Sequence, residues 1–539
     1  MADFISGSLD SFTQLNITHD NEKWQYIGFY AQDNWKVNSR VTVNYGLRWE
    51  PYLNGRLLNG QVTHFNMADF LNNVHSTVFP NAPAGTLYPG DPGFDTGGRP
   101  NQTSWLNFAP RLGVAFDPKG DGKTLIRASW GIFYDMPHTL FYYNYSSEPL
   151  WGSSVTITNP QGGFANPWLG YPGGNPFPTH QNASSKYPTA GYYETVPLHV
   201  KNTYVEQWNL TLQRQFGSSW LLKASYMGNN TVHLWTDEEL NPAVYVPGNC
   251  AAGQFGLRTA GLCSTTGTTQ ARRLFTQLNP SQGPFYGTVE SLDDGGTASY
   301  HALIVSAEHR FAKNFSMLAN YTFAHCIADP QTTELSGPIY TNPADRRFDR
   351  GNCTAVDVRH NFNLSAVIQS PHYNSRALQI IAADWQLAPI VGMHTSNYFT
   401  VATGVDSALS GVSTTGQRPN LVQSDPYCAN RNANCWLNFN AFGAPGPGTL
   451  GNLGINNLTG PGYFDLDLAL SRRFKIRERQ TIEIRAESFN LENRANFLSP
   501  AAASLVGGTV NNALNSSTFG KIQSDVSPRI MQFAVKYAF

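Results

Sequence analysis

The stretch RIMQFAVKYAF (529–539), at the C-terminal end, decides the fold class. Its apolar residues alternate with polar or small ones, and a period of two places the two sets on opposite faces of a β-strand. The apolar set consists of Met531, Phe533, Val535, Tyr537 and Phe539. The length suits a tilted strand that crosses a bilayer, which needs about 9–11 residues. A soluble β-sandwich that happens to finish on a strand is the alternative at this point.

The composition of the whole chain favours a membrane-spanning sheet. Of its 539 residues, 14% are charged and 13% are aromatic, whereas soluble domains contain about 25% charged residues. No apolar run approaches the ~18–20 residues of a membrane-spanning helix, which excludes a helical membrane protein. A transmembrane barrel fits, because its lipid face is apolar only at alternate positions. The net charge of −1 argues against a nucleic-acid partner, which would call for a basic surface.

Alternating segments recur in pairs along the chain, and each pair is joined by a short turn. The predicted pairs cover residues 28–36 and 41–49, 108–116 and 126–134, 204–216 and 220–228, 303–307 and 315–323, 360–368 and 385–393, and 464–470 and 482–486. With the terminal strand the count is about thirteen, and a fourteenth strand could precede Trp24. The predicted fold class is all-β, an antiparallel transmembrane β-barrel with about 13–14 strands in this chain.

The lengths of the connections alternate strictly. Short turns are expected at 37–39, 117–123, 217–218, 313–314, 369–379 and 475–479, and long connections at 51–106, 136–201, 230–296, 328–356, 396–461 and 491–528. Transmembrane barrels have this asymmetry, with short periplasmic turns and long extracellular loops. Phe539 then lies on the periplasmic side. A soluble sandwich has no reason to sort its loops by length, so the barrel is the preferred interpretation.

The long connections are rich in aromatic residues, as at Phe164, Trp168 and Tyr171. Disordered segments are usually poor in aromatics, and long loops over a rigid scaffold are where recognition tends to occur. We therefore expect ordered extracellular loops that contain the substrate-binding residues, although the sequence does not identify those residues.

The six cysteines all fall in or beside predicted extracellular loops. They are Cys250, Cys263, Cys326, Cys353, Cys428 and Cys435. Six cysteines allow 15 connectivities, but each of three long loops holds two, so pairing within each loop is the simplest choice. An oxidising exported compartment permits disulfides. A zinc site is the alternative, but no Cys-x-x-Cys spacing occurs, so disulfides are favoured.

Other motifs give weaker indications. The cluster Asp345–Arg350 could bind an anion, but a solvated loop with internal ion pairs is the favoured interpretation. The run 293–296, Asp-Asp-Gly-Gly, lacks the spacing of a calcium loop and is expected to form a turn. The glycine-rich run 448–462 lacks the strand–turn–helix context of a phosphate-binding loop. Glu483, Arg485 and Glu487 are expected to form a charge ladder on the lumen side.

No sequence arrangement typical of a nucleophile, a metal site or a cofactor site occurs in the chain. The sequence therefore predicts that the protein is not an enzyme and has no cofactor or metal site.

Several strings resemble the barrel of TonB-dependent outer-membrane receptors, specifically the Oar-like branch (carboxypeptidase-regulatory-like domain-containing proteins) of Acidobacteria. These strings are FYAQDNWKVNSRVTVNYGLRWEP (29–51), FAPRLGVAFDP (108–118), YVEQWNLTLQRQF (204–216), TGVDSALSGVSTTGQRPNLV (403–422), RAESFNLENRANF (485–497) and FGKIQSDVSPRIMQFAVKYAF (519–539). They extend from about residue 20 to the C-terminus. The alternating end with Phe533, Val535, Tyr537 and Phe539 resembles the signal read by the barrel-assembly machinery.

The resemblance implies a location in the outer membrane, in contact with lipid. Family members have a signal peptide, a TonB box and a plug inside a 22-stranded barrel, none of which is recognisable here. Residues 24–539 therefore resemble the C-terminal part of such a barrel, preceded by a lead-in or partial strand over 1–23. The implied function is uptake of a scarce large nutrient, such as a glycan, peptide or metal chelate, with TonB acting only through a plug that this chain lacks. A passive pore or a surface-binding adhesion protein is the alternative.

Overall fold

The computed structural model describes most of the chain, and the account below is confined to the described residues. These are residues 9, 11–16, 21–94, 96–135, 142, 145, 148–152, 154–158, 160–171, 174–175, 177–178, 181–312, 314–331, 340–353, 357–371, 373–413, 416–477, 480–497, 510–526 and 528–539. Residue 313 and parts of the predicted connections 51–106, 136–201, 328–356, 369–379, 396–461, 475–479 and 491–528 lie outside them, as do residues 1–8, 10 and 17–20 of the predicted lead-in.

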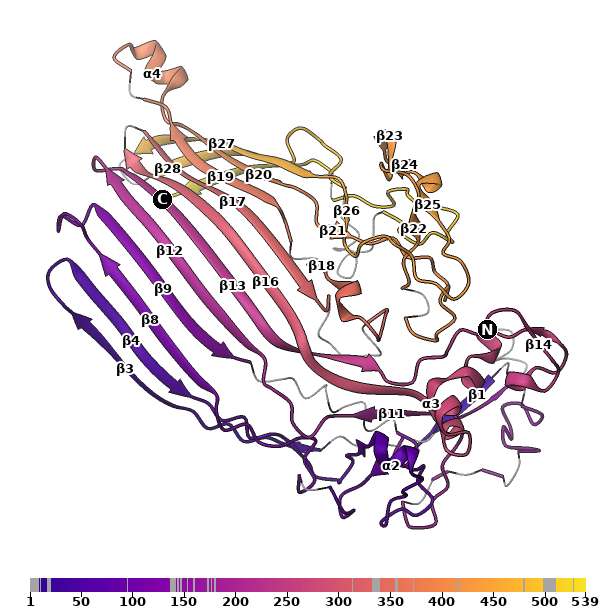
Figure 1. Ribbon diagram of the computed structural model, residues 1–539. Coiled ribbons are helices and arrows are strands. Elements are labelled where there is room, and N and C mark those ends of the chain that lie inside the picture. The colour runs from indigo at the N-terminus through magenta and orange to yellow at the C-terminus, as the bar shows by residue number, and fades with distance from the viewer. Residues whose placement is uncertain are drawn as a thin grey trace.

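One large sheet of thirteen consecutive antiparallel strands dominates the fold (Figure 1). Its strands are β3 (Phe29–Lys36), β4 (Val41–Trp49), β8 (Phe108–Phe116), β9 (Thr124–Tyr134), β12 (Tyr204–Phe216), β13 (Trp220–Glu239), β16 (Tyr286–Ala312), β17 (Phe315–Asp329), β19 (His360–Gln369), β20 (Trp385–His394), β27 (Tyr463–Arg477), β28 (Gln480–Phe489) and β29 (Ile530–Ala538). Two short strands, β11 (Gly191–Thr195) and β18 (Gly351–Asn352), attach to β16 and β17. The predicted count of about thirteen and the all-β antiparallel class are confirmed.

The strand register keeps one face of the sheet largely apolar, with an exception on the edge strand β3, where the Asp33 carboxylate accepts from the Tyr45 hydroxyl (3.2 Å). In adjacent strands Tyr45 pairs with Leu112, Leu112 with Trp130, and Trp130 with Trp208. At the other edge Val535 pairs with Ile484. Apart from the half-buried Trp208, these side chains remain exposed in the isolated chain, as expected for a surface that faces lipid rather than water.

The short turns all lie at the end of the sheet where the chain finishes. Asp117 shapes one of them, since its carboxylate accepts backbone hydrogen bonds from Gly120 (2.9 Å) and Gly122 (2.7 Å). Both glycines have φ of +70°, a conformation that residues with a Cβ rarely adopt. The turn predicted at 369–379 is longer than expected, because it extends to residue 384 and contains helix α4 (Arg376–Ala382). In Figure 1 α4 lies at the same end as the C-terminus.

The bounds predicted for the long connection at 230–296 are wrong at both ends. Strand β13 continues to Glu239 and β16 begins at Tyr286, so the two strands project as a long hairpin beyond the length that a bilayer requires. Asp293 and Gly296 lie within β16, not in the predicted turn. Register shifts on β13, between Val232 and Thr236, break the alternation that would have revealed the strand.

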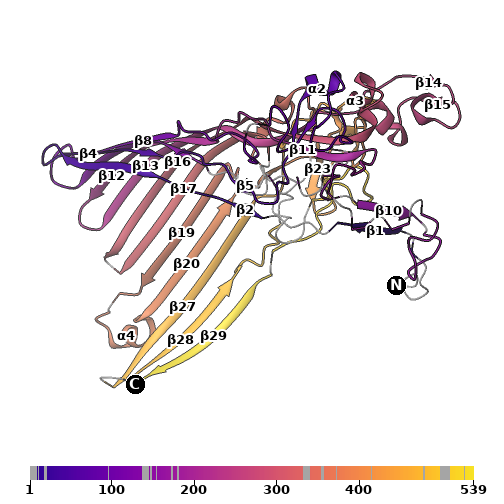
Figure 2. The same ribbon diagram turned by 90° about the horizontal axis from the view of Figure 1, so that it is seen from below.

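The sheet is open. Figure 2 shows its strands following one another around a curved wall from β4 to β29. Within the described residues, β3 and β29 each pair on one side only. No fourteenth strand of this sheet is described before Trp24, because β1 (Ser11–Leu15) pairs with β10 (Ser154–Thr158) and β2 (Glu22–Lys23) with β5 (Arg56–Leu57).

The long connections fold into a layer at the other end of the sheet. Its short strands include β6 (His64–Phe65), β7 (Thr86–Leu87), β14 (Asn249–Cys250), β15 (Gly261–Leu262), β21 (Tyr398–Phe399), β22 (Asn420–Leu421), β23 (Tyr427–Asn432), β24 (Cys435–Leu437), β25 (Phe442–Gly443) and β26 (Leu458–Thr459). Its helices are α2 (Met67–Leu71), α3 (Leu274–Leu278) and the 3-10 turns η2 (Gln254–Gly256), η3 (Thr266–Thr268), η4 (Gln270–Arg272), η5 (Gly283–Phe285), η6 (Arg346–Asp349) and η7 (Phe439–Ala441). Among the described helices, none combines the length and the apolarity needed to cross a bilayer.

Candidate functional site: a polar wall beneath a folded loop layer

A polar furrow runs across the face of the sheet opposite the lipid-facing one. It encloses about 440 Å³ and spans strands β3 to β13. Its polar lining comes from Gln32, Asp33, Asn34, Asn44, Arg111, Ser129, Gln207, Asn209 and Asn229, and its apolar lining includes Leu112, Trp130, Phe133, Trp208 and Met227. Amides and hydroxyls supply both donors and acceptors, so this wall can hydrogen-bond a polar solute without carrying much charge.

Strand register explains why these side chains gather. Asn44 lies opposite Gly113, Gly113 opposite Ser129, and Ser129 opposite Asn209. Asn209 Nδ2 donates to Ser129 Oγ across the strands (2.7 Å). Gly113 leaves space in the furrow, because it has no side chain between the polar side chains of Asn44 and Ser129. Sequence reasoning assigned no residue to this wall, although the polar half of each alternating strand could have identified it.

Among the described residues that line this furrow, Arg111 is the one cation. Its guanidinium lies over the ring of Phe133, 4.5 Å from the ring centroid. The stacking holds the side chain along the wall, where its donors remain available to a solute.

The predicted charge ladder is confirmed, and its position on the lumen side stays a prediction because the sheet is open. Glu483 contacts Arg473 (3.1 Å) and Arg485 (2.8 Å), and Arg485 also contacts Glu487 (3.3 Å). These residues alternate along β28 with Ile482 and Ile484, whose partners on β29 are the lipid-facing Tyr537 and Val535. The ladder therefore lies on the same polar face as the furrow.

The largest buried hydrophobic clusters of the described residues lie in the folded loop layer, not in the membrane-spanning part of the sheet. One cluster joins the first two long connections to the upper ends of β13 and β16, through Tyr52, Val62, Tyr145, Trp235 and Leu292. A second cluster joins the last two long connections, and includes Phe399, Leu437, Phe442, Leu458 and Phe519. The described parts of the loops are therefore ordered and packed, as their aromatic content predicts.

The arginine cluster at 345–350 is arranged differently from the prediction. Its ion pairs reach other segments: Arg346 binds Asp293 (2.7 Å) and Arg350 binds Asp329 (3.4 Å). Asp349 forms a buried ion pair with Arg418. The prediction of internal pairs is wrong because η6 directs these side chains outward to neighbouring strands and loops. Arg346, Arg347 and Arg350 line a hollow of about 500 Å³.

All six cysteines pair as predicted, in or beside three separate connections, with Cys326 near the end of β17. Cys250 bonds to Cys263, Cys326 to Cys353, and Cys428 to Cys435. The Cα–Cα distances are 5.0, 5.3 and 5.9 Å, within the usual range for disulfides.

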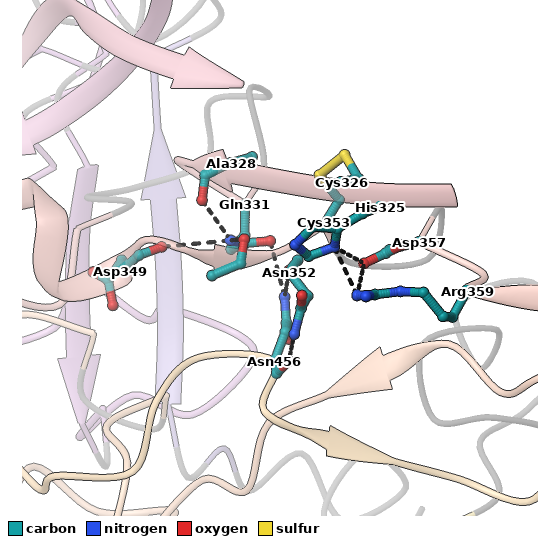
Figure 3. Close-up of a disulfide and its surroundings, with 11 residues drawn as sticks. His325, Cys326, Ala328, Gln331, Asp349, Asn352, Cys353, Asp357, Arg359 and Asn456 are labelled. Atoms are coloured by element: carbon teal, nitrogen blue, oxygen red, sulfur yellow. Dashed lines mark hydrogen bonds and ion pairs between the residues drawn. A yellow bond between two sulfur atoms is a disulfide. The ribbon is translucent and has the colours of Figure 1, made fainter. Parts of the chain in front are cut away.

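The Cys326–Cys353 disulfide lies beside a network of amides that joins two loops (Figure 3). Asn456 Nδ2 donates to the Asn352 carbonyl and to Gln331 Oε1, both at 2.8 Å. Asn352 Nδ2 donates in return to the Asn456 carbonyl (2.8 Å). The fourth long connection is thereby fixed both to β17 and to the fifth connection.

The aromatic residues of the terminal strand face outward. Phe533 and Val535 are 73% and 74% exposed, and Tyr537 and Phe539 are also exposed. Their ring and methyl surfaces are therefore available to lipid or to another protein. A role for Phe533, Val535, Tyr537 and Phe539 in barrel assembly stays a prediction.

Comparison with solved structures finds large outer-membrane proteins with low sequence identity. The outer membrane transporter YddB from Escherichia coli matches with 10% identity and a TM-score of 0.43, covering 95% of this chain and 45% of that one. A variant of the ferric enterobactin receptor PfeA from Pseudomonas aeruginosa matches with 10% identity, a TM-score of 0.40 and coverage of 95% and 44%. The siderophore receptor PirA from Acinetobacter baumannii matches with 10% identity, a TM-score of 0.39 and coverage of 95% and 45%. The chain thus spans less than half the length of these proteins.

Comparison with curated protein sequences gives no match. The family comparison is decisive, because residues 1–532 match the family described as the outer membrane beta barrel domain. That match covers nearly the whole chain and agrees with the antiparallel sheet, its apolar outer face and its sorted loops. The chain belongs to the outer membrane β-barrel domain family and resides in the outer membrane.

Proposed function

We propose that this chain forms part of the barrel of a TonB-dependent receptor of the Oar-like branch. In this proposal the extracellular loops bind a scarce large nutrient, such as a glycan, peptide or metal chelate, and the polar wall guides it inward. The protein acts as a transporter and not as an enzyme. The observation that carries the proposal is the polar furrow on the inner face of a sheet whose extracellular end is covered by folded loops.

The open sheet supports the further proposal that other strands complete the barrel. Unpaired backbone groups in hydrocarbon cost several kcal/mol each, so neither β3 nor β29 is stable with its free edge in lipid. The additional part would also carry the plug through which TonB acts, as the resemblance to the receptor family implies.

The test is uptake by cells that express the complete native protein. Fluorescently labelled oligosaccharides, peptides and ferric chelates serve as probes, and cells with and without TonB are compared. We expect one probe class to bind at the surface in both strains but to enter only when TonB is present.

Two variants test the polar wall itself. Arg111→Ala removes the cation of the furrow, and we expect uptake to fall several-fold while surface binding stays unchanged. Arg40→Ala, in an exposed periplasmic turn, removes the same charge away from the furrow and serves as the control.

Uptake that does not depend on TonB would contradict the proposal in favour of a passive pore. Surface binding without uptake in either strain would instead indicate an adhesion protein.

A further inference from the structure

Among the residues that the structure describes, three carboxylates meet in the loop layer without a basic side chain beside them. Glu194 lies on β11, Asp237 on β13 and Glu290 on β16, and one carboxylate oxygen from each lies within 4.8 Å of the other two. Glu194 pairs with Glu290 in the parallel β11–β16 ladder. Asp237 lies 17 positions beyond Trp220, where β13 begins, well above the length of strand that spans the membrane.

These carboxylates are almost completely removed from solvent. Asp237 is 0% exposed and Glu194 and Glu290 are each 1% exposed. Among the described residues, no hydrogen-bond donor reaches either carboxylate oxygen of Asp237 or the Oε1 atom of Glu194. An ionised carboxylate buried without a partner is strongly unfavourable, so both unpartnered side chains indicate a missing positive group.

The hydrogen bonds that are present do not balance this charge. The Tyr192 hydroxyl lies 2.9 Å from Glu194 Oε2 and 2.7 Å from Glu290 Oε2, but a hydroxyl carries a single proton and can donate to only one of them. The nearby Glu239 already has its own partner, Arg273, at 3.4 Å. In the described part of the chain, no lysine or arginine forms an ion pair with Glu194, Asp237 or Glu290.

A fourth carboxylate adds to the negative charge. Glu148 Oε1 accepts from Thr63 Oγ1 (2.7 Å) and from the backbone N–H of Glu194 (3.1 Å). Its Oε2 atom is buried and has no partner among the described residues. Burial raises the pKa of the Glu194 and Asp237 carboxyls and raises the pKa of Glu290 to about 7. In the part of the chain that the structure describes, four buried carboxylates therefore lie together without a basic side chain paired to them.

We propose that Glu194, Asp237 and Glu290 form a divalent-cation site, suited to calcium, that joins the second and third extracellular connections. Calcium prefers carboxylate oxygens at 2.3–2.6 Å, so two ligands on opposite sides of the ion lie about 4.6–5.2 Å apart. The oxygens of the cluster fit within that span. Magnesium usually keeps several waters and is seldom bound by an all-protein cage, so this closed, buried cluster of carboxylates suits it less well. The site lies outside the furrow and does not depend on the proposed transport function.

The test is metal binding by the full chain in detergent after divalent cations have been removed. Terbium luminescence reports a lanthanide in a calcium site, and calorimetry with CaCl₂ measures calcium directly. We expect saturable binding of one ion per chain and displacement of terbium by calcium. Asp237→Asn should weaken binding about tenfold or more, because calcium affinity follows the number of charged ligands. Glu238→Gln serves as the control, since it removes the same charge from the opposite face of β13, and its affinity should match the wild type.

A second readout keeps the proposal testable if Asp237→Asn does not fold. In the wild-type protein, EDTA should speed proteolysis within residues 135–203 and 240–285 several-fold, and excess calcium should reverse the effect. Glu290→Gln should make proteolysis in these segments insensitive to EDTA. The proposal is overturned if the wild type binds neither terbium nor calcium, or if Asp237→Asn binds as the wild type does. Failure of transport would leave these measurements unchanged, so the two proposals fail separately.

Discussion

At the scale of single residues, Asp91 organises the first extracellular connection. Its Oδ1 atom accepts from the backbone N–H of Thr77 (2.6 Å) and from Thr77 Oγ1 (2.7 Å). Its Oδ2 atom accepts from the backbone N–H of Tyr88 (2.9 Å). Burial acts to raise the pKa of Asp91, but the hydrogen bonds that it accepts outweigh burial and lower the pKa below its usual value. A single carboxylate therefore joins two turns of the loop.

Asp91→Asn should loosen this loop without affecting the sheet. Hydrogen bonds to a charged group contribute about 1.5–3 kcal/mol, and the amide keeps only part of them. Because the folded pKa is depressed, the stabilisation by Asp91 is complete above an unfolded pKa of about 3.9 and is lost as the pH falls through the folded value. Hydrogen exchange of residues 74–94 should therefore be faster in Asp91→Asn than in the wild type at pH 7, and the difference should shrink below about pH 4.

The half-buried Asp69 of the same loop supplies the control. Among the described residues, no hydrogen bond engages its carboxylate, so Asp69→Asn should leave exchange unchanged. Equal exchange in Asp91→Asn and the wild type at pH 7 would contradict the prediction.

Residue-level predictions from the sequence succeeded where the interacting positions are close along the chain. The cysteine pairs are separated by 13, 27 and 7 positions, and the ladder partners Glu483 and Arg485 are two positions apart. The carboxylate cluster was missed because Glu194 and Glu290 meet only through the parallel pairing of β11 with β16. No alternation pattern predicts that short strand.

At the scale of elements, the disulfides differ in what they hold together. Cys326–Cys353 closes 27 positions and joins β17 to the loop that bonds with Asn456. Cys428–Cys435 closes only 7 positions within the β23–β24 hairpin. Loop-closure entropy grows with length, so the first should stabilise the folded chain by about 3–4 kcal/mol and the second by about 2 kcal/mol.

Removing the two bonds separately should therefore give distinct results. The double variant Cys326→Ser/Cys353→Ser should increase proteolysis in both the fourth and the fifth extracellular connections, because the amide network of Figure 3 transmits the loss. Cys428→Ser/Cys435→Ser should affect only its own hairpin. Protease mapping by mass spectrometry measures both. Cleavage confined to the fourth connection in the first variant would show that the amide bonds do not couple the two loops.

Element boundaries could be predicted wherever alternation continues through the membrane-spanning part of a strand. The prediction failed above that part, where β13 and β16 extend into the loop layer. There the strands are covered by loops such as those that carry Tyr145 and Val62, so both faces are buried and the period of two disappears. In addition, the adjacent residues Gly295 and Gly296 have the sequence signature of a turn, although they lie within β16.

At the scale of the whole molecule, the direction of the strands limits how the barrel can close. All twelve neighbouring pairs along the path from β3 to β29 are antiparallel. With thirteen strands alternating in direction, β3 and β29 run the same way. Direct closure would require one parallel pair, whereas bacterial barrels of this kind have an even number of antiparallel strands. The alternating sequence pattern predicts each strand, but it contains no information about which strand covers an edge.

We therefore predict that β3 and β29 each pair with a further strand and not with each other. A photo-crosslinking amino acid at Asn34 on β3, or at Lys536 on β29, captures the neighbouring strand in membranes that contain the native protein. The same amino acid at Asn363 on β19 is the control, and it should capture only β17 and β20, its partners in the sheet. We expect each edge position to crosslink to its known partner, β4 or β28, and also to a further segment that is neither β3 nor β29. The reason is that each free edge exposes backbone groups that lipid cannot satisfy. A crosslink from Asn34 to β29 of the same chain would contradict the prediction and would show that thirteen strands close through a parallel seam.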